Sequence, residues 1–279
     1  MAERGRMPAI AERTILVTGA TDGLGRETAR ALARRGASLL IAGRDPERGQ
    51  GTVDEIASEG HGPPPRLYLA DLGSLDQVRR LASEIDEGND RVDTLVNNAG
   101  IGGTGGDRRL SEDGYELTFA VNYLSHVLLT ELLLPLLRRS APSRIVNVAS
   151  VGQAPIDFDD PMLERGYEGF RAYRQSKLAQ IMFTFELAER LDPSEVTVNA
   201  VHPASLMDTR MVRETFGAAR TSVAEGVRSL LHLIASPELD GVTGRYFDGT
   251  RESTAHEQAY DPDARRRLRA LTERLVAGG

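Results

Sequence analysis

The sequence contains no cysteine, which excludes disulfides, thiolate metal sites and cysteine nucleophiles. Its histidines are scattered and include no i, i+4 pair of the kind that holds zinc on a helix, so we expect no metal site. They are His61, His126, His202, His232 and His256. A chain without redox-active thiols fits the cytoplasm, and this is the location that we predict.

Positive charge is in the minority. The chain has 34 Lys+Arg against 41 Asp+Glu, a formal charge of −7. Binding to a phosphate backbone needs a basic footprint, so we predict no nucleic-acid partner. The run from Arg265 to Arg269 is the most basic stretch, but Asp261, Asp263 and Glu273 surround it. We interpret it as the solvated face of a helix.

Long hydrophobic runs are also missing. Residues 1–13 form a polar N-terminal extension with no apolar segment that could serve as a signal peptide. The longest apolar stretch, 126–137, contains Glu131 and Pro135, whereas a membrane span needs ~20 apolar residues. We therefore predict no membrane partner.

Lysine is almost absent: Lys177 is the only lysine among the 34 Lys and Arg residues. The phosphate loop of nucleotide hydrolases needs a lysine beside a glycine-rich turn, and Lys177 has no such turn next to it. The nucleotide-hydrolase interpretation is thus excluded. A single lysine in an arginine-rich chain indicates that Lys177 occupies a position where a planar guanidinium cannot replace a compact ammonium.

With 279 residues and 40% hydrophobic side chains, the chain can bury a sizeable core. Short β-branched runs alternate with segments of helical period, the pattern of buried parallel strands joined by helical crossovers. We predict an α/β fold, a single-domain Rossmann-type doubly wound parallel sheet over residues 14–279, with a long helix over 111–139. The expected strands cover 15–17, 39–41, 67–69, 94–96, 144–148, 196–201 and 244–247.

A glycine-rich turn follows the first predicted strand and opens the first helix. Its glycines let the backbone turn tightly and approach a pyrophosphate at the positive end of that helix. The spacing is G-x-x-x-G-x-G, and the alternative is a turn that binds no ligand. The residues that we expect to contact a cofactor here are Thr18, Gly19, Thr21, Asp22, Gly23, Leu24 and Gly25.

The end of the second predicted strand indicates which nucleotide binds. An acid there would bind the ribose 2′-hydroxyl of NAD, and an arginine would bind the 2′-phosphate of NADP. Gly43 occupies the place of the acid and Arg44 follows it, so we favour NADP(H) over NAD(H). Asp45 would oppose a phosphate if it turned inward. In the alternative interpretation Arg44 only solvates a helix start.

Tyr173 and Lys177 lie four residues apart in a helical pattern, which places them on one helix face. A free phenol has a pKa near 10, and a neighbouring ammonium together with a nicotinamide cation would lower it, which suits acid/base catalysis. A solvated pair of side chains is the alternative. Ser150 ends the fifth strand and Asn122 lies in the predicted long helix, so both could reach the same edge of the sheet.

Together these residues resemble the short-chain dehydrogenase/reductase family. The insert 155–170 and the tail near Gly244-Arg245-Tyr246-Phe247 are similar to those of its retinol-dehydrogenase-like branch. Asp71-Leu72 is similar to the adenine contact of the family, and Asn97-Asn98-Ala99-Gly100 to its fourth-strand motif. Asn122, Ser150, Tyr173 and Lys177 resemble its catalytic tetrad. The resemblance implies cofactor contacts from Asn98, Ala99, Gly100, Tyr173, Lys177, Pro203 and Thr209.

The resemblance also implies roles. Tyr173 would exchange the proton of the alcohol, and Ser150 would hold the substrate oxygen. Lys177 would bind the nicotinamide ribose and depress the pKa of the tyrosine, and Asn122 would hold a water in the proton relay. The family pattern of Pro-Gly after the sixth strand is replaced by Pro203-Ala204. More residues separate Ser150 from Tyr173 than in the family's shorter members.

The predicted function is an NADP(H)-dependent oxidoreductase that interconverts a ketone or aldehyde and an alcohol, its small-molecule substrate. Loops near 151–170 and 204–223 would set specificity, and the resemblance implies a homodimer or homotetramer. Two alternatives stay open. One is a catalytically silent NAD(P)-binding sensor or scaffold, and the other is an epimerase or dehydratase that retains its cofactor.

Overall fold

The computed structural model describes residues 6–59, 62–103, 106–217 and 219–278. Residues 1–5 of the predicted extension and residue 218 of the predicted second loop lie outside this set. Eight strands form one sheet in the order β3-β2-β1-β4-β5-β6-β7-β8. The strands are β1 Thr14–Thr18, β2 Ser38–Gly43, β3 Arg66–Leu69, β4 Thr94–Asn97, β5 Ser143–Val148, β6 Val196–His202, β7 Arg245–Asp248 and β8 Arg251–Ser253.

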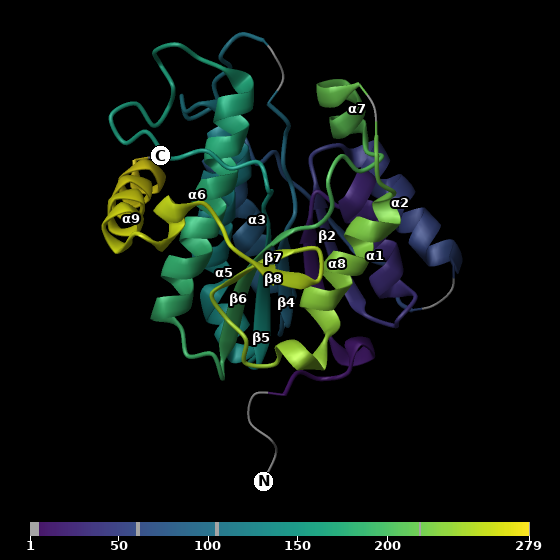
Figure 1. The fold of residues 1–279 in the computed structure, drawn as a ribbon. Helices are drawn as coiled ribbons and strands as arrows, with labels where there is room; N and C mark the ends of the chain where they lie inside the picture. Colours follow the sequence, from purple (N-terminus) through teal and green to yellow (C-terminus); the bar gives the residue numbers. More distant parts are fainter. Residues whose placement is uncertain (1–5, 60–61, 104–105, 218, 279) are drawn as a thin grey trace.

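Helices cover both faces of this sheet, as Figure 1 shows. One face carries α1 Gly23–Ala33, α2 Pro46–Glu59 and α8 Val223–Ala235. The other carries α3 Leu75–Gly88, α5 Ser125–Arg139 and α6 Gly169–Arg190, with α9 Pro262–Ala277 outside α6. The short helices are η1 Ile10–Glu12, α4 Leu117–Phe119, η2 Ala120–Leu124, α7 Arg210–Phe216, η3 Pro237–Leu239 and η4 Glu257–Tyr260. The predicted doubly wound α/β fold is confirmed.

The core has two halves because successive side chains of a strand point to opposite faces of the sheet. Leu16 packs in the half under α3, α5 and α6. Its neighbours Ile15 and Val17 pack in the half under α1 and α8. Since both faces are buried, the central strands read as continuous apolar runs, and this made them recognisable in the sequence.

The predicted long helix is wrong at its start. Residues 110–116 turn back on themselves, with a bridge between Leu110 and Glu116, and helical structure begins at Leu117. The Glu116 carboxylate accepts a hydrogen bond of 2.6 Å from the Phe119 N–H, so a side-chain cap sets the helix start. Asn122 lies in the π-helical turn η2 and not in a regular helix.

The strand set also needs a correction, because β7 is not the last strand. β8 pairs with it in antiparallel fashion, Phe247 opposite Glu252. All three β8 residues are exposed and none is apolar. Only the hydrogen bonds of the sheet edge make this segment a strand, and apolar periodicity could not reveal it.

The helical stretch Leu117–Arg139 has 23 residues, and its most apolar 18-residue window has a mean hydropathy of 1.4, so by length and composition it could cross a membrane. The sequence interpretation, which stopped at 126–137, understated it. In the structure 83% of its most apolar window is buried within the protein, where Leu129, Leu133 and Leu136 belong to the core. It therefore serves as a core helix of this fold.

Helix α9 packs across α6 and η2. Tyr123 and Thr272 share a hydrogen bond of 2.8 Å. Arg265 is buried and its guanidinium donates to Glu189 at 2.5 Å, so the prediction of a wholly solvated arginine face is wrong at this position. The carboxylate partners of Arg265, Glu186 and Glu189, come from α6, and proximity in the sequence could not show them.

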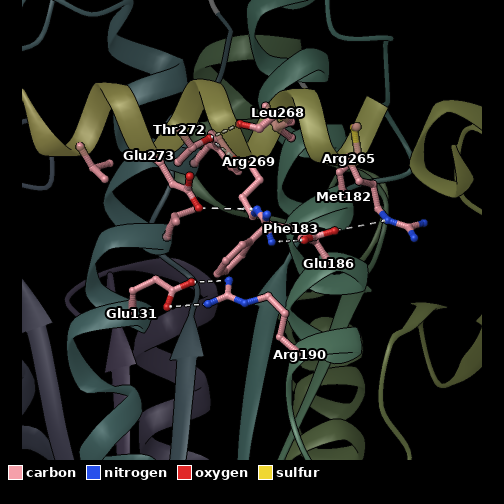
Figure 2. A pocket seen from close by; sticks show the side chains of 13 residues that line it. Glu131, Met182, Phe183, Glu186, Arg190, Arg265, Leu268, Arg269, Thr272 and Glu273 are labelled. Atoms are coloured by element: carbon pink, nitrogen blue, oxygen red, sulfur yellow. Dashed lines mark hydrogen bonds and ion pairs between the residues drawn. The ribbon is translucent and has the colours of Figure 1, made fainter. Parts of the chain in front are cut away.

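A cavity of about 240 Å³ lies between α5, α6 and α9. Figure 2 shows Glu131 paired with Arg190 on one side, and Glu186 facing Arg265 and Arg269 on the other. None of the residues that line this cavity is a predicted site residue. Its charged groups pair with one another across the helices.

Candidate active site

The predicted site residues gather where parallel strands end. β4 lies between β1 and β5, and β6 follows β5, so the carboxyl ends of these strands meet at one edge of the sheet. Thr18 ends β1, Ser150 follows β5 and Pro203 follows β6. The N-terminus of α1 and the middle of α6 reach the same edge. The chain therefore brings together segments that lie far apart in the sequence.

The glycine-rich turn is tied to the end of β4. The Thr18 hydroxyl accepts hydrogen bonds from the N–H groups of Asn98 and Ala99, at 3.0 and 3.1 Å. The Asn98 amide donates to the Thr18 carbonyl at 2.8 Å. Gly19 has φ +65°, and a Cβ there would meet Cα of Ala99 at 2.7 Å. Only glycine lets the two segments approach this closely.

Asp22 caps α1, because its Oδ1 accepts a hydrogen bond of 2.7 Å from the Gly23 N–H. Its other oxygen lies 3.3 Å from Arg210 and 3.5 Å from Arg48. The negative charge that the sequence places at the turn is thus balanced by two arginines from other elements. Thr209 lies against Gly23, with its methyl group 3.2 Å from where a Cβ would stand. The buried Leu24 anchors the first turn of α1 in the core.

The end of β2 has no room for an acidic side chain. A Cβ on Gly43 would meet the Thr21 methyl at 2.4 Å, so Thr21 covers the place where an NAD-binding acid would stand. Arg44 is exposed, and its guanidinium lies 4.0 Å from the carboxylate of Asp71. Asp45 caps α2 by accepting from the N–H groups of residues 47 and 48, both at 3.1 Å.

Asp71 and Leu72 follow β3. The Asp71 carboxylate accepts a hydrogen bond of 2.8 Å from the Gly73 N–H, and the Asp71 N–H donates to the Gln77 side chain at 3.0 Å. Leu72 is buried in the core. The segment is held beside the end of β2 by the hydrogen bond from the Ala70 N–H to the Gly43 carbonyl at 3.0 Å, and the adenine contact stays a prediction.

Tyr173 and Lys177 project from the same side of α6, and the Lys177 Nζ lies 5.8 Å from the centre of the Tyr173 ring. The Ser150 hydroxyl, which follows β5, acts on the Tyr173 phenol and lowers its pKa. Ser150 also accepts a hydrogen bond of 3.0 Å from the Gly152 N–H. The structure thus assembles a phenol, a hydroxyl and an ammonium at one place.

The fall in the pKa of Tyr173 that we expect with a bound nicotinamide cation stays a prediction, because burial of the phenol acts in the opposite direction. Burial raises the pKa of Tyr173, and the hydrogen bond from Ser150 offsets this only in part. Burial penalises the charged phenolate, and the nearby ammonium donates to the Val148 carbonyl and the Gln180 side chain. The sequence showed the spacing of Tyr173 and Lys177 but not their solvation.

Lys177 is buried and donates to two acceptors, the Val148 carbonyl and the Gln180 side-chain oxygen, both at 2.8 Å. Burial lowers the pKa of Lys177 to about 7. A lysine with such a pKa can change its charge near neutral pH. This shift comes from desolvation, because burial penalises the charged ammonium.

Asn122 is fully buried next to this cluster. Its amide donates to the Ser176 hydroxyl at 3.0 Å and to the Ile101 carbonyl at 3.1 Å, and its oxygen accepts from the Ile101 N–H at 2.8 Å. A Cβ on Gly100 would stand 3.2 Å from the Asn122 oxygen and 3.6 Å from the Lys177 Nζ. Asn122 therefore joins the end of β4 to α6.

The C-terminal part of the chain positions Ser150. Its carbonyl oxygen accepts hydrogen bonds from Tyr246 Oη at 3.1 Å and from Gln153 Nε2 at 3.0 Å. The His256 N–H holds the Gln153 side chain at 2.7 Å. On the other side of the site, the carbonyl of Pro203 accepts from the Ser229 hydroxyl at 2.7 Å.

Sequence reasoning missed several residues that contact the predicted ones. Gln180 could have been found from its position three residues after Lys177, on the same helix face. Arg48 lies four residues after Arg44, in the first turn of α2, and its place near the end of β2 offered a signal. The contacts of His126, Arg210 and Tyr246 cross between elements, and periodicity gave no sign of them.

Comparison with known proteins adds to this geometry. Residues 13–219 match the family model of the short chain dehydrogenases. The chain belongs to the short-chain dehydrogenase family. It is 39% identical over 282 residues to retinol dehydrogenase 13 of Mus musculus, across 95% of this chain and 84% of that protein.

Solved structures agree. An uncharacterised protein from Mycobacterium Paratuberculosis has a TM-score of 0.78 and 31% identity, over 97% of this chain and 96% of the other. A short chain dehydrogenase from Escherichia coli CFT073, complexed with NADPH, has a TM-score of 0.71 and 28% identity, over 85% and 96% of the two chains.

The chain is therefore an NAD(P)-dependent oxidoreductase of the retinol-dehydrogenase-like type. Its residues fit a nicotinamide cofactor. The Asp22 side chain caps the Gly23 N–H at the start of α1. The first N–H groups of a helix have no intrahelical partner and attract phosphate. The missing Cβ of Gly100 leaves space beside Asn122 and Lys177.

Proposed function

We propose that this protein is an NADP(H)-dependent oxidoreductase that interconverts a ketone or aldehyde and an alcohol, with Tyr173 as the general acid/base. The observation that carries the proposal is the cluster of Tyr173, Ser150 and Lys177 beside the glycine turn. Silent binding would not require a phenol whose pKa a neighbouring hydroxyl lowers and whose ring centre lies 5.8 Å from a buried ammonium.

The residues divide the work. The bound nicotinamide supplies or accepts the hydride, which is the difficult chemistry. Ser150 holds the substrate oxygen, and Tyr173 gives it a proton during reduction or removes one during oxidation. Lys177 binds the nicotinamide ribose, and its ammonium with the oxidised cofactor favours the phenolate against the effect of burial. Asn122 holds a water of the proton relay.

Four features support a preference for NADP(H). Arg44 is exposed and its ion pair with Asp71, at 4.0 Å, is long, so its guanidinium can bind a 2′-phosphate. Thr21 occupies the place of an NAD-binding acid. Arg48 lies 3.4 Å from Asp45 and balances its charge. The similar Escherichia coli protein is complexed with NADPH.

For the substrate we propose an alcohol or carbonyl compound with a sizeable apolar part. The similarity to a retinol dehydrogenase favours this class. Val151 and Phe170 are exposed apolar side chains close to Ser150 and Tyr173 in the sequence, and the Phe170 ring stacks on the Tyr173 ring at 6.4 Å. We propose that residues 14–279 act as one domain, with specificity in the loops 151–170 and 204–223.

Assembly and location stay predictions. Helix α9 covers one face of α6, so the predicted homodimer or homotetramer would have to pair other helix faces. Light scattering after gel filtration measures the number of subunits. The cytoplasmic location and the absence of a membrane partner are tested by fractionating cells that express the chain. The helical stretch Leu117–Arg139 makes this a useful experiment.

The decisive experiment is a panel of carbonyl compounds, followed at the nicotinamide absorbance with NADPH and NADH in parallel. We expect turnover that is faster with NADPH, and we expect Tyr173→Phe to abolish it while NADPH binding persists. Tyr68→Phe, on β3 and away from the site, is the control. Tight NADPH binding without turnover across the panel would favour the sensor instead.

A further inference from the structure

A chain of three buried side chains runs behind the predicted site. The Lys177 Nζ donates to the Gln180 oxygen at 2.8 Å, and the Gln180 amide nitrogen lies 2.7 Å from Nδ1 of His126. All three side chains are almost fully buried. We propose that Gln180 and His126 are positioning residues, which hold the ammonium of Lys177 and fix the side-chain oxygen that faces it.

The chemistry of the three groups sets the orientation of each. An ammonium has only donors, so the Gln180 atom that faces Lys177 must be the oxygen. The amide nitrogen then points to His126 and donates to Nδ1. That nitrogen must carry a lone pair, so His126 is neutral with its proton on Nε2.

The electrostatics of His126 agree with this assignment. Burial and the nearby Lys177 lower the pKa of His126 to about 3, and an interaction with the backbone of Ala99 opposes them. The imidazole therefore stays neutral throughout the physiological pH range. A neutral imidazole accepts the hydrogen bond of the Gln180 amide and so holds the orientation of that amide. If the amide rotated by half a turn, its N–H groups would face the ammonium of Lys177.

Lys177 depends on such acceptors because it has no carboxylate partner. The titratable groups that face it are Tyr173 on α6, His126 on α5 and His202 on β6, within the part of the chain that the structure describes. None of them carries a negative charge at neutral pH when the pKa of Tyr173 is raised. The Val148 carbonyl and the Gln180 oxygen thus stabilise the charge that burial penalises.

This inference rests on the proposed function for what Lys177 does, but its test does not. Because Lys177 is the only lysine in the sequence, protein that carries lysine labelled with ¹³C at Cε, expressed without a lysine-containing tag, gives a single lysine resonance. Its chemical shift between pH 5 and 10 reports the pKa of Lys177 directly. No cofactor and no turnover are needed.

Two substitutions at one position should act in opposite directions. Gln180→Met removes the acceptor at similar length, and we expect it to lower the pKa of Lys177 by ~1 pH unit. Gln180→Glu places a negative charge there, and we expect it to raise the pKa by ~1 pH unit or more. His126→Phe frees the amide to turn over and should lower the pKa by a smaller amount.

Thr130→Val is the matched control, since Thr130 lies one turn after His126 on α5, is equally buried, and bonds to Asn97 instead. It should leave the pKa of Lys177 unchanged. The proposal is wrong if both Gln180 variants move the pKa in the same direction, or if neither differs from the control. If His126→Phe does not fold, the Gln180 pair still decides.

The pH profile of kcat/KM supplies a second measurement. In an active enzyme, the pKa that the profile assigns to Lys177 should shift in each variant by the same amount as the pKa measured from the lysine resonance. A shifted resonance in a protein without turnover would leave this inference standing and overturn the proposed function. An active enzyme whose lysine pKa is the same in all variants would overturn this inference and leave the proposed function standing.

Discussion

Tyr246 Oη donates a hydrogen bond of 3.1 Å to the carbonyl oxygen of Ser150. It ties β7 to the loop that carries the predicted substrate-binding hydroxyl. Both groups are buried, and burial raises the pKa of Tyr246, so the phenol remains a donor throughout the working pH range. The position of Ser150 thus depends on β7, which begins at Arg245, 95 residues after the serine in the sequence.

We expect Tyr246→Phe to lower the free energy of unfolding by ~1 kcal/mol, because it deletes one buried hydrogen bond. The rate should fall through kcat, because Ser150 is less well fixed, while the Kd for NADPH stays unchanged. Urea unfolding and steady-state kinetics measure both. Tyr68→Phe, whose hydroxyl accepts a hydrogen bond from Asn89 at the far side of β3, serves as the control. Equal kcat values for the two variants would contradict the positioning role.

Ser150→Ala removes the hydroxyl that lowers the pKa of Tyr173. We therefore expect the pKa of Tyr173 to rise further. Alcohol oxidation needs the phenolate, so kcat/KM should rise as the pH passes through the pKa of Tyr173. In Ser150→Ala this rise should occur at higher pH. The rate itself should fall ~10²-fold or more. Ser150→Thr keeps a hydroxyl and should retain the parent profile, whereas the same pH profile for alanine and threonine would argue against the contact.

Arg44→Ala should weaken NADPH binding ~10-fold or more, the usual loss for a charge-assisted hydrogen bond. NADH has no 2′-phosphate, so its Kd should change little. Fluorescence titration with both cofactors measures the difference. Arg35→Ala, an exposed arginine after α1, should alter neither value. Equal losses for NADPH and NADH would mean that Arg44 does not contact the phosphate.

Lys177 also links stability to pH. Its pKa falls from 10.5 to about 7 on folding, so between these values the unfolded chain binds more protons than the folded one. The free energy of unfolding should therefore rise with pH over this window, by up to ~1.4 kcal/mol per pH unit from this group. The cost of burying the charge is fully present below pH 7.

Lys177→Met lacks this titration, and Lys177→Arg stays charged throughout. We expect the free energy of unfolding of the parent to rise relative to both variants between pH 7 and pH 9, in urea titrations at fixed ionic strength. Curves that remain parallel over that range would show that the lysine is not desolvated.

The sequence by itself determined the order of the elements and the pairs that share a local turn or helix face. Alternating apolar runs and helical periods predicted the central strands, and the four-residue spacing placed Tyr173 and Lys177 on one side of α6. These features depend on neighbours within a few residues, which periodicity records. The glycine turn was visible for the same reason, because its backbone requirements are local.

Only the tertiary structure decided the rest. The helix that carries Asn122 begins at Leu117 because the carboxylate of Glu116 caps it, and β8 exists because an edge was available. The raised pKa of Tyr173, the lowered pKa of Lys177 and the contact of Gln180 with His126 all arise from burial between distant segments. Desolvation and pairing depend on what the folded chain places around a group, and this information is not contained in the order of its neighbours.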